Sequence, residues 1–258
     1  MRIVACYKYV LDERDIRINP EDRALVTDRA AWKISDYDRN AIEEAVRIKE
    51  RSGGAAVFGL TAGPAQAKAS LKDALSRGLD EVYFVQDESL AGADPRVTAR
   101  VLARALEKIG DCRLVLCGEG ASDDYAQQVG PRLGVLLGWP VVTYVSKLEI
   151  TGDTLRAERK LEDGLEIVEV ELPAVVTVTG EVNQPRIPSL KQVMAAGKKP
   201  MHIWSLADLG LGGDALAAAV EVRSLRGAVT DRKRVVFRGD PAEAVVRLVE
   251  ALVKEGLI

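Results

Sequence analysis

The sequence predicts an α/β fold, a mostly parallel sheet with helices on both faces, plus an antiparallel hairpin and a C-terminal extended arm. Short apolar runs alternate with longer amphipathic segments through the first 145 residues, and this alternation is typical of βαβ units. Right-handed crossovers then place helices on both faces of the parallel part. Residues 168–172 instead alternate apolar and acidic side chains, which indicates a half-exposed antiparallel strand.

In the first half, each expected helix follows an expected strand. We expect the strands at 2–10, 55–60, 81–85 and 114–117. We expect the helices after Ser35, over 65–77, after Asp94-Pro95 and from about Asp124. Gly78 stands where a left-handed helix stop is easiest, and Asp94 followed by proline is a typical helix start.

After Pro140 the pattern changes to shorter connections. A strand at 141–146 precedes a hairpin whose arms, 155–161 and 165–172, flank a Glu-Asp-Gly turn. Residues 173–179 are expected as a last buried strand. Residues 180–200 contain three prolines and show neither a helical nor a strand period, so we expect an extended arm there. A helix is expected over 240–257.

Composition excludes several classes of protein. The net charge of -3 gives no electrostatic signature of nucleic-acid binding. No apolar run reaches the length of about 18 residues needed to cross a membrane, and the N-terminus lacks a secretory signal. Three scattered cysteines and a single histidine argue against a metal site and favour a reducing, cytoplasmic compartment. No acid–base pair or nucleophile stands out, so we assign no catalytic residue.

The segment at 117–130, CGEGASDDYAQQVG, is the strongest candidate for a binding site. It follows a buried strand, and the carboxyl ends of parallel strands are where open α/β sheets bind ligands. Glycines and a helix start favour a phosphate group. However, Asp123 and Asp124 repel phosphate unless they contact sugar hydroxyls or amines. The segment is neither a P-loop nor a GxGxxG fingerprint, so an ordinary strand-to-helix turn is equally compatible with it.

Three further places in the sequence allow a structural and a functional interpretation. Ser35 and Asp36 stand at a helix start, where plain N-capping explains them. Cys6 ends the first strand and is more typical of a small buried residue than of a reactive thiol. The segment at 183–190, NQPRIPSL, either docks into a partner's groove through its apolar tip or wraps its own domain.

Together these motifs resemble the electron-transfer flavoprotein beta subunits over nearly the whole chain. The resemblance is carried by RIVACYKYVLDE, KISDYDRNAIEEA, TAGPAQ, the loop at 117–140, and the long run AERKLEDGLEIVEVELPAVVTVTGEVNQPRIPSLKQVMAAGKKP. Within the family, the sequence looks most like the FixA-like branch. Many members read Asn-Pro-Phe-Cys or Asn-Pro-Tyr-Asp where this chain has Ser35-Asp36-Tyr37-Asp38. Gly197 also interrupts a stretch that is often lysine-rich.

The resemblance implies an adenine-nucleotide α-hydrolase-like (Rossmann-like) fold that binds FAD or, alternatively, AMP. It implies a FixB-like alpha subunit as partner. Further partners would be a FixC-like quinone oxidoreductase and a FixX-like ferredoxin, or an acyl-CoA-type dehydrogenase. NADH would be the electron donor in a bifurcating complex, located in the cytoplasm or at a membrane through a partner. The alternative is a non-redox adenine-nucleotide-binding protein of the same fold, which would need no alpha subunit.

Residues are carried over position by position from the resemblance. Those expected around the cofactor are Cys6, Ser35, Asp36, Tyr37, Asp38, Ala62, Gly118, Glu119, Gly120, Ala121, Ser122, Asp123, Asp124, Tyr125, Ala126, Gln127, Gln128 and Val129. Pro188, Ser189 and Leu190 are expected to recognise a partner, with Leu190 as the apolar anchor. The implied domains are a nucleotide-binding domain over 1–200, with a hairpin at about 148–172 and a recognition loop at about 183–195. A C-terminal arm and helix over 201–258 would dock on the alpha subunit.

Overall fold

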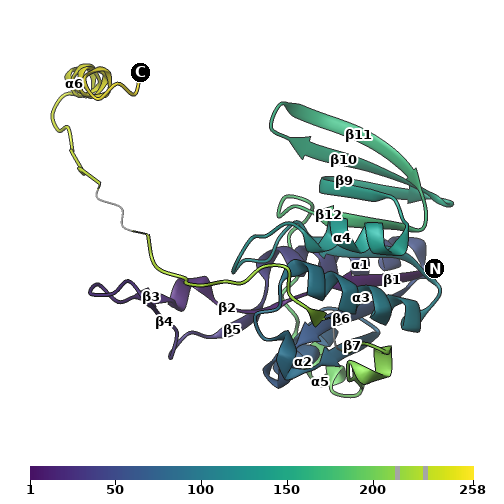
Figure 1. Ribbon diagram of the computed structural model, residues 1–258. Helices are drawn as coiled ribbons and strands as arrows, with labels where there is room; N and C mark the ends of the chain where they lie inside the picture. Colours follow the sequence, from purple (N-terminus) through teal and green to yellow (C-terminus); the bar gives the residue numbers. More distant parts are fainter. Residues whose placement is uncertain (213–215, 229–231) are drawn as a thin grey trace.

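The computed structural model describes residues 1–212, 216–228 and 232–258, and its main element is a nine-stranded sheet (Figure 1). The strands are β1 Arg2–Cys6, β6 Ala56–Gly63, β7 Glu81–Gln86, β8 Cys112–Gly118, β9 Val141–Thr151, β10 Thr154–Leu161, β11 Gly164–Glu171, β12 Ala174–Val178 and β13 Met201–Trp204. Their order in the sheet is β11-β10-β9-β12-β8-β1-β6-β7-β13. All neighbours pair in parallel except β9, β10 and β11, which pair antiparallel among themselves. The predicted parallel sheet with an added antiparallel hairpin is confirmed.

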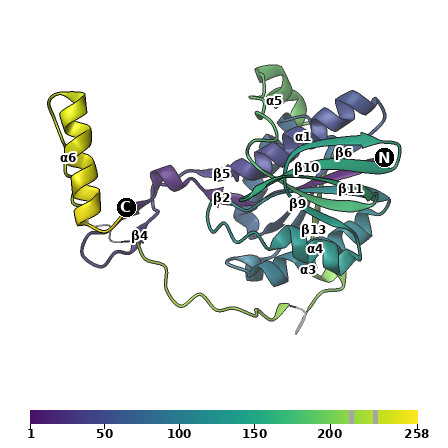
Figure 2. The same ribbon diagram turned by 90° about the horizontal axis from the view of Figure 1, so that it is seen from above.

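Helices cover both faces of the sheet (Figure 2). They are α1 Asp36–Ser52, α2 Ser70–Ser76, α3 Pro95–Ile109, α4 Val129–Leu137 and α5 Leu190–Ala196. Helix α6 Pro241–Lys254 lies away from the sheet, near the C-terminus (Figure 1). One apolar cluster joins the sheet to α1 and α2 through residues such as Ile42 and Leu71. The other joins it to α3 and α4 through residues such as Val101 and Leu133. Burial on both faces explains why most strands are continuously apolar.

The helix ends largely follow the sequence signals. Asp94 caps α3 by accepting a hydrogen bond from the amide of Val97, with proline at the first turn. Gly78 has a φ of 117°, as expected for a left-handed stop. The expected helix at 65–77 begins differently, because its first five residues, Ala65–Ala69, form a 3-10 helix before α2.

The N-terminal segment forms two strands rather than the single strand expected over 2–10. After β1, the chain turns at Lys8 and enters β2 Tyr9–Leu11, which pairs with β5 Trp32–Ile34 outside the main sheet. Between them, β3 Arg17–Ile18 and β4 Leu25–Val26 form the tip of a projecting hairpin (Figure 1). The backbone of Lys8 is held by Asp38 and Ser35, so it cannot continue the ladder of the sheet.

Two other expectations are wrong. No helix begins at Asp124, because Tyr125 and Gln127 have φ values of 47° and 57°, which a right-handed helix does not allow. The segment 121–128 therefore stays irregular until α4. The segment 180–200 is not wholly extended, because a capping box between Ser189 and Gln192 starts the short helix α5.

The strand at 173–179 is not the last one, because β13 adds a further parallel strand at the edge of the sheet, beside β7. The buried side chains of Leu206 and Leu209 then pack against the α3 face. The compact body thus extends beyond residue 200, to about residue 211.

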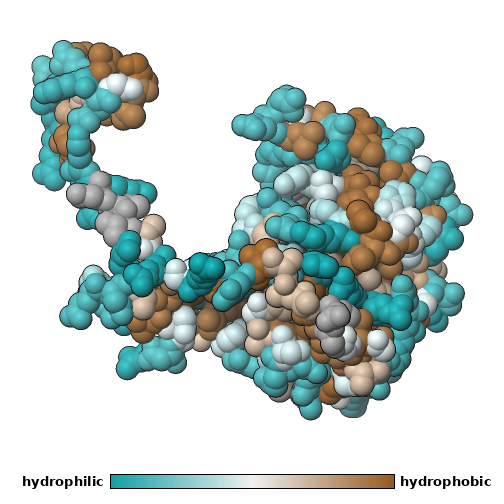
Figure 3. Space-filling model, viewed as in Figure 1, coloured by the Kyte–Doolittle hydropathy of each residue, from teal (hydrophilic) through white to brown (hydrophobic). Residues whose placement is uncertain are grey.

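The C-terminal arm leaves this body and ends in α6, which has no buried residues. Asp94 first holds the arm by accepting hydrogen bonds from the amides of Ala219 and Val220. Gly227 then hydrogen-bonds to Arg23 in the projecting hairpin. Hydrophobic side chains gather on one side of α6 (Figure 3), and in this chain they contact no core.

Candidate functional site

The candidate site lies where the strand order reverses. From β1 the chain goes by α1 to β6 and then by α2 to β7, whereas α3 returns it to β8 on the other side of β1. The carboxyl ends of β1 and β8 are therefore a topological switch point, where open α/β sheets bind their ligands. Cys6 ends β1 and Gly118 ends β8, so the structure brings these two predicted residues to the same place.

Asp38 joins the two strands at this point. One carboxylate oxygen accepts a hydrogen bond from the amide of Lys8 at 2.8 Å, and the other accepts one from the amide of Gly118 at 3.1 Å. Burial raises the pKa of Asp38 to about 7, against the opposing effect of these two hydrogen bonds. Asp38 lies in the first turn of α1, so it fixes that helix to both strand ends.

The residues from Gly118 to Gln128, which we call the site loop, fold onto the start of α1. Ser35 accepts a hydrogen bond from the amide of Ser122 at 3.2 Å. The ammonium of Lys8 lies 2.7 Å from a carboxylate oxygen of Asp123 and 3.2 Å from one of Asp124. Burial alone lowers the pKa of Lys8, but these two carboxylates outweigh burial and raise it.

The two glycines of the site loop allow close packing within the protein. A Cβ atom on Gly118 would lie 2.6 Å from Asp38 and 2.7 Å from the Cβ atom of Tyr37. A Cβ atom on Gly120 would lie 2.7 Å from the ring of Tyr125. The sequence favoured the approach of a phosphate to these glycines, whereas here α1 and Tyr125 occupy that space. A ligand that contacts Gly120 on this side therefore requires Tyr125 to move.

Two hydroxyl groups at this end of the sheet are suited to a polar ligand. Thr61 precedes Ala62 near the end of β6, and its buried hydroxyl has no hydrogen-bond partner. The hydroxyl of Ser122 in the site loop is likewise buried and unpartnered. Buried polar atoms in native proteins are nearly always paired. Either hydroxyl could pair with a polar atom of a bound ligand.

The last residues of the site loop lead into α4. Gln128 stands at the N-cap of α4, but its side chain accepts hydrogen bonds from Arg132 instead of capping the helix. The first amides of α4, beginning at Val129, therefore lack a side-chain cap. Uncapped amides at a helix start favour an anion.

The remaining predicted cofactor residues differ in their accessibility. The thiol of Cys6 is buried beside Cys117, and both this hydrogen-bonded neighbour and burial raise its pKa well above the ordinary range. The rings of Tyr37 and Tyr125 form a tilted pair with their centroids 5.3 Å apart. The carboxylate of Asp36 is bound by Lys33 and Arg39.

The predicted partner-recognition residues lie on a different part of the surface. Leu190 is 76% exposed, and neighbouring Ile187 is 93% exposed. Ser189 caps α5, so its side chain is engaged locally. We call residues 187–190 the recognition segment, because it presents these exposed apolar side chains.

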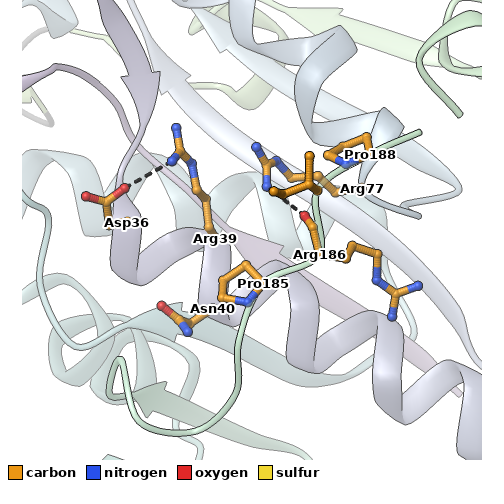
Figure 4. A pocket seen from close by; sticks show the side chains of 8 residues that line it. Asp36, Arg39, Asn40, Arg77, Pro185, Arg186 and Pro188 are labelled. Atoms are coloured by element: carbon orange, nitrogen blue, oxygen red, sulfur yellow. Dashed lines mark hydrogen bonds and ion pairs between the residues drawn. The ribbon is translucent and has the colours of Figure 1, made fainter. Parts of the chain in front are cut away.

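A cavity of about 330 Å³ lies beside the recognition segment (Figure 4). The guanidinium groups of Arg39 and Arg77 lie on neighbouring sides of it, while Arg186 extends away along α1. Arg39 binds Asp36, and Arg77 donates to the backbone carbonyl of Arg186. The lining is completed by Asn40, Pro185, Ile187 and Pro188.

Sequence reasoning missed the face of α1 that holds this region in place. Arg186 forms ion pairs with Glu43 at 2.8 Å and with Glu50 at 2.7 Å. Asn183 exchanges hydrogen bonds with Asn40 and donates to Glu44. Glu43 and Glu44 are buried among apolar residues of an amphipathic helix. Buried acidic residues need partners. The two glutamates on the buried face of this helix were therefore the sequence signal for these contacts.

Within the described ranges, no group of three or more histidine, cysteine, aspartate or glutamate residues could hold a metal ion. Among the same residues, no helix is both long and apolar enough to cross a membrane.

The fold and the switch point define a doubly wound α/β protein with a tightly bonded loop at its ligand-binding edge. A comparison with protein families matches residues 23–209 to the electron transfer flavoprotein domain. This match covers more than half of the chain, so the chain belongs to the electron transfer flavoprotein family. Proteins of this family bind FAD or AMP and work with partner subunits and dehydrogenases.

Proposed function

We propose that the chain is the beta subunit of an electron-transfer flavoprotein and holds FAD or AMP at the switch point between β1 and β8. The observation that carries the proposal is the hydrogen bonding of Asp38 to both strand ends, beside a loop with an unpartnered buried hydroxyl. The site loop is continuous with the uncapped start of α4, which suits the phosphate.

The residues proposed around the cofactor divide by role. Backbone amides of Gly120 and Ala121 and at the start of α4 would hold phosphate, because the amides of Gly118 and Glu119 already donate to Asp38 and to the carbonyl of Val178. Ser122 and Thr61 would bind sugar or phosphate oxygens through their free hydroxyls. Asp38 and Ser35 would keep the site loop in place. FAD, when bound, supplies the redox chemistry, and the chain supplies position and burial.

The proposed partner is a FixB-like alpha subunit, which would cover the apolar side of α6 and carry a second flavin. In the FixA-like branch, NADH would donate electrons that are divided between a ferredoxin or flavodoxin and quinone through FixC-like and FixX-like proteins. An acyl-CoA-type dehydrogenase is the corresponding partner of a simple electron shuttle. The recognition segment would contact such a partner through Leu190.

Identification of the released cofactor tests this proposal. The complex would be purified and denatured, and the released compounds would be identified by mass and counted. Two FAD molecules per heterodimer support a bifurcating protein, and one FAD with one AMP supports a simple shuttle. A chain that is stable alone and holds an adenine nucleotide but never a flavin partner would instead indicate a non-redox nucleotide-binding protein.

A further inference from the structure

Lys8 has a fixed position at the switch point. Its amide donates a hydrogen bond to Asp38, and its carbonyl accepts one from the amide of Ser35 at 3.0 Å. Both backbone groups of Lys8 are therefore tied to the start of α1. The side chain starts from this fixed backbone and reaches the site loop, where its ammonium contacts Asp123 and Asp124.

The Lys8 ammonium can exchange its two carboxylate partners in the site loop for another anion. About 45% of the Lys8 side chain is exposed, and the side chains of Asp123 and Asp124 are 35% and 53% exposed. Ion pairs this exposed contribute about 1 kcal/mol or less. An ammonium held in this way can pass to a stronger anion without a large loss of stability.

Other cations near the site loop are less available. Lys33 is buried and contacts three carboxylates, those of Asp12, Glu13 and Asp36. Arg132 binds Gln128 at the far end of the loop. Among the described residues, Lys8 is the cation that contacts the acidic middle of the loop, beside the unpartnered hydroxyl of Ser122.

We infer that Lys8 binds the phosphate of the nucleotide and that Asp123 and Asp124 hold its ammonium when no phosphate is present. This inference rests on the proposed nucleotide-binding function. A phosphate group carries up to two negative charges on one compact group, which matches the charge of the two half-exposed carboxylates together, and it accepts strong charge-assisted hydrogen bonds from an ammonium. The two carboxylates then turn to solvent, where they no longer face the phosphate.

The opposite arrangement, in which Lys8 only holds the loop closed, makes a different prediction. If Lys8 acts as a latch, removing either partner of the ion pair opens the loop and weakens nucleotide binding. If Lys8 binds phosphate, removing Asp123 and Asp124 frees the ammonium and strengthens nucleotide binding. The sign of the effect at the two aspartates therefore separates a binding residue from a positioning residue.

The test measures the affinities of AMP and of adenosine by calorimetry, using purified protein freed of bound nucleotide. Wild type is compared with Lys8→Gln and with the double variant Asp123→Asn/Asp124→Asn. We expect Lys8→Gln to weaken AMP binding about tenfold or more and to leave adenosine binding unchanged. We expect the double variant to bind AMP roughly threefold more tightly. Thermal unfolding of each variant verifies that the fold is intact.

Three results would overturn the inference. If wild type and Lys8→Gln bind AMP equally well, Lys8 does not bind the phosphate, while the proposed nucleotide-binding function still stands. A double variant that loses as much AMP affinity as Lys8→Gln would show that Lys8 is a latch. Wild-type protein that binds neither AMP nor adenosine would overturn the nucleotide-binding function together with the Lys8 role.

Discussion

Asp38 is the residue on which the geometry of the candidate site depends most. The sequence placed it at a helix start, where an acidic residue usually caps the helix or faces water. In the structure it is buried and binds two amides that are far apart in sequence, that of Lys8 just after β1 and that of Gly118 at the end of β8. Local pattern could place Asp38 near the ligand edge, but not in contact with Gly118, because that contact depends on which strands are neighbours.

The raised pKa of Asp38 predicts a pH dependence of stability. Its folded-state pKa of about 7 exceeds the ordinary value of 3.8, so the folded state binds more protons between these two values. The stability that Asp38 contributes is fully present below about pH 4 and is lost as the pH rises to about 7. Chemical unfolding of wild type and Asp38→Asn over this range should show the advantage of wild type shrinking as pH rises. A constant difference would contradict the shift.

Replacement of Gly118 by alanine is expected to cause a steric clash at the site. In Gly118→Ala the new methyl group would lie 2.6 Å from the Asp38 carboxylate and 2.9 Å from the backbone carbon of Tyr37. Because a backbone atom cannot turn aside, we expect a loss of about 1–3 kcal/mol in unfolding free energy. Gly54→Ala is the matched control, since nothing lies within 4 Å of its added atom. Equal urea midpoints for the two variants would show that the site loop adapts freely.

At the scale of elements, regular patterns were predicted well and short or irregular segments were not. The hairpin of β10 and β11 was found because residues 168–172 alternate apolar and acidic side chains after a Glu-Asp-Gly turn, a pattern typical of an antiparallel hairpin. The short helix α5 was missed because three prolines nearby mask its capping box. The helix expected at Asp124 was wrong because the left-handed backbone of Tyr125 and Gln127 leaves no trace in composition.

The ion pairs of Arg186 predict that α1 stabilises the base of the recognition segment. In Arg186→Gln, the buried Glu43 loses one of its two arginine partners and Glu50 loses its partner. We expect a loss of about 1–3 kcal/mol and faster amide exchange over residues 183–190. Lys160→Gln is the control, because its pair with Glu181 is exposed on both sides and should contribute less than about 1 kcal/mol. Similar losses in both variants would contradict a special role of Arg186.

A substitution in the recognition segment is expected to weaken partner binding without loss of bound nucleotide. Leu190→Ala removes an apolar side chain that supports no core, so fold and nucleotide content should stay unchanged. We expect the affinity for the electron-accepting or electron-donating partner to fall by about 2 kcal/mol or more, as at interface hot spots. Leu165→Ala on β11 is the control, since Leu165 is also exposed and lies on the hairpin. Loss of nucleotide in Leu190→Ala would mean that the segment belongs to the fold instead.

At the scale of the whole molecule, the sequence predicted the layers of the fold but not the order of its strands. The return of β8 to the far side of β1 creates the switch point, and this choice depends on packing between distant segments. The end of the body was also hard to place. Four residues of β13 are too few to show a period, and Leu206 and Leu209 lie in a 3-10 turn that is too short for a helical pattern.

The separation of body and arm predicts how truncations affect stability. A chain that ends before Gly239 loses α6, which buries no residue in this chain. Its urea midpoint should therefore match that of the full chain, while assembly with an alpha subunit is lost. A chain that ends at residue 200 also loses β13 and the buried Leu206 and Leu209. Burial of two leucines contributes about 3–6 kcal/mol, so this second chain should be strongly destabilised or insoluble. If the first truncation were as damaging as the second, α6 would have to pack against the body.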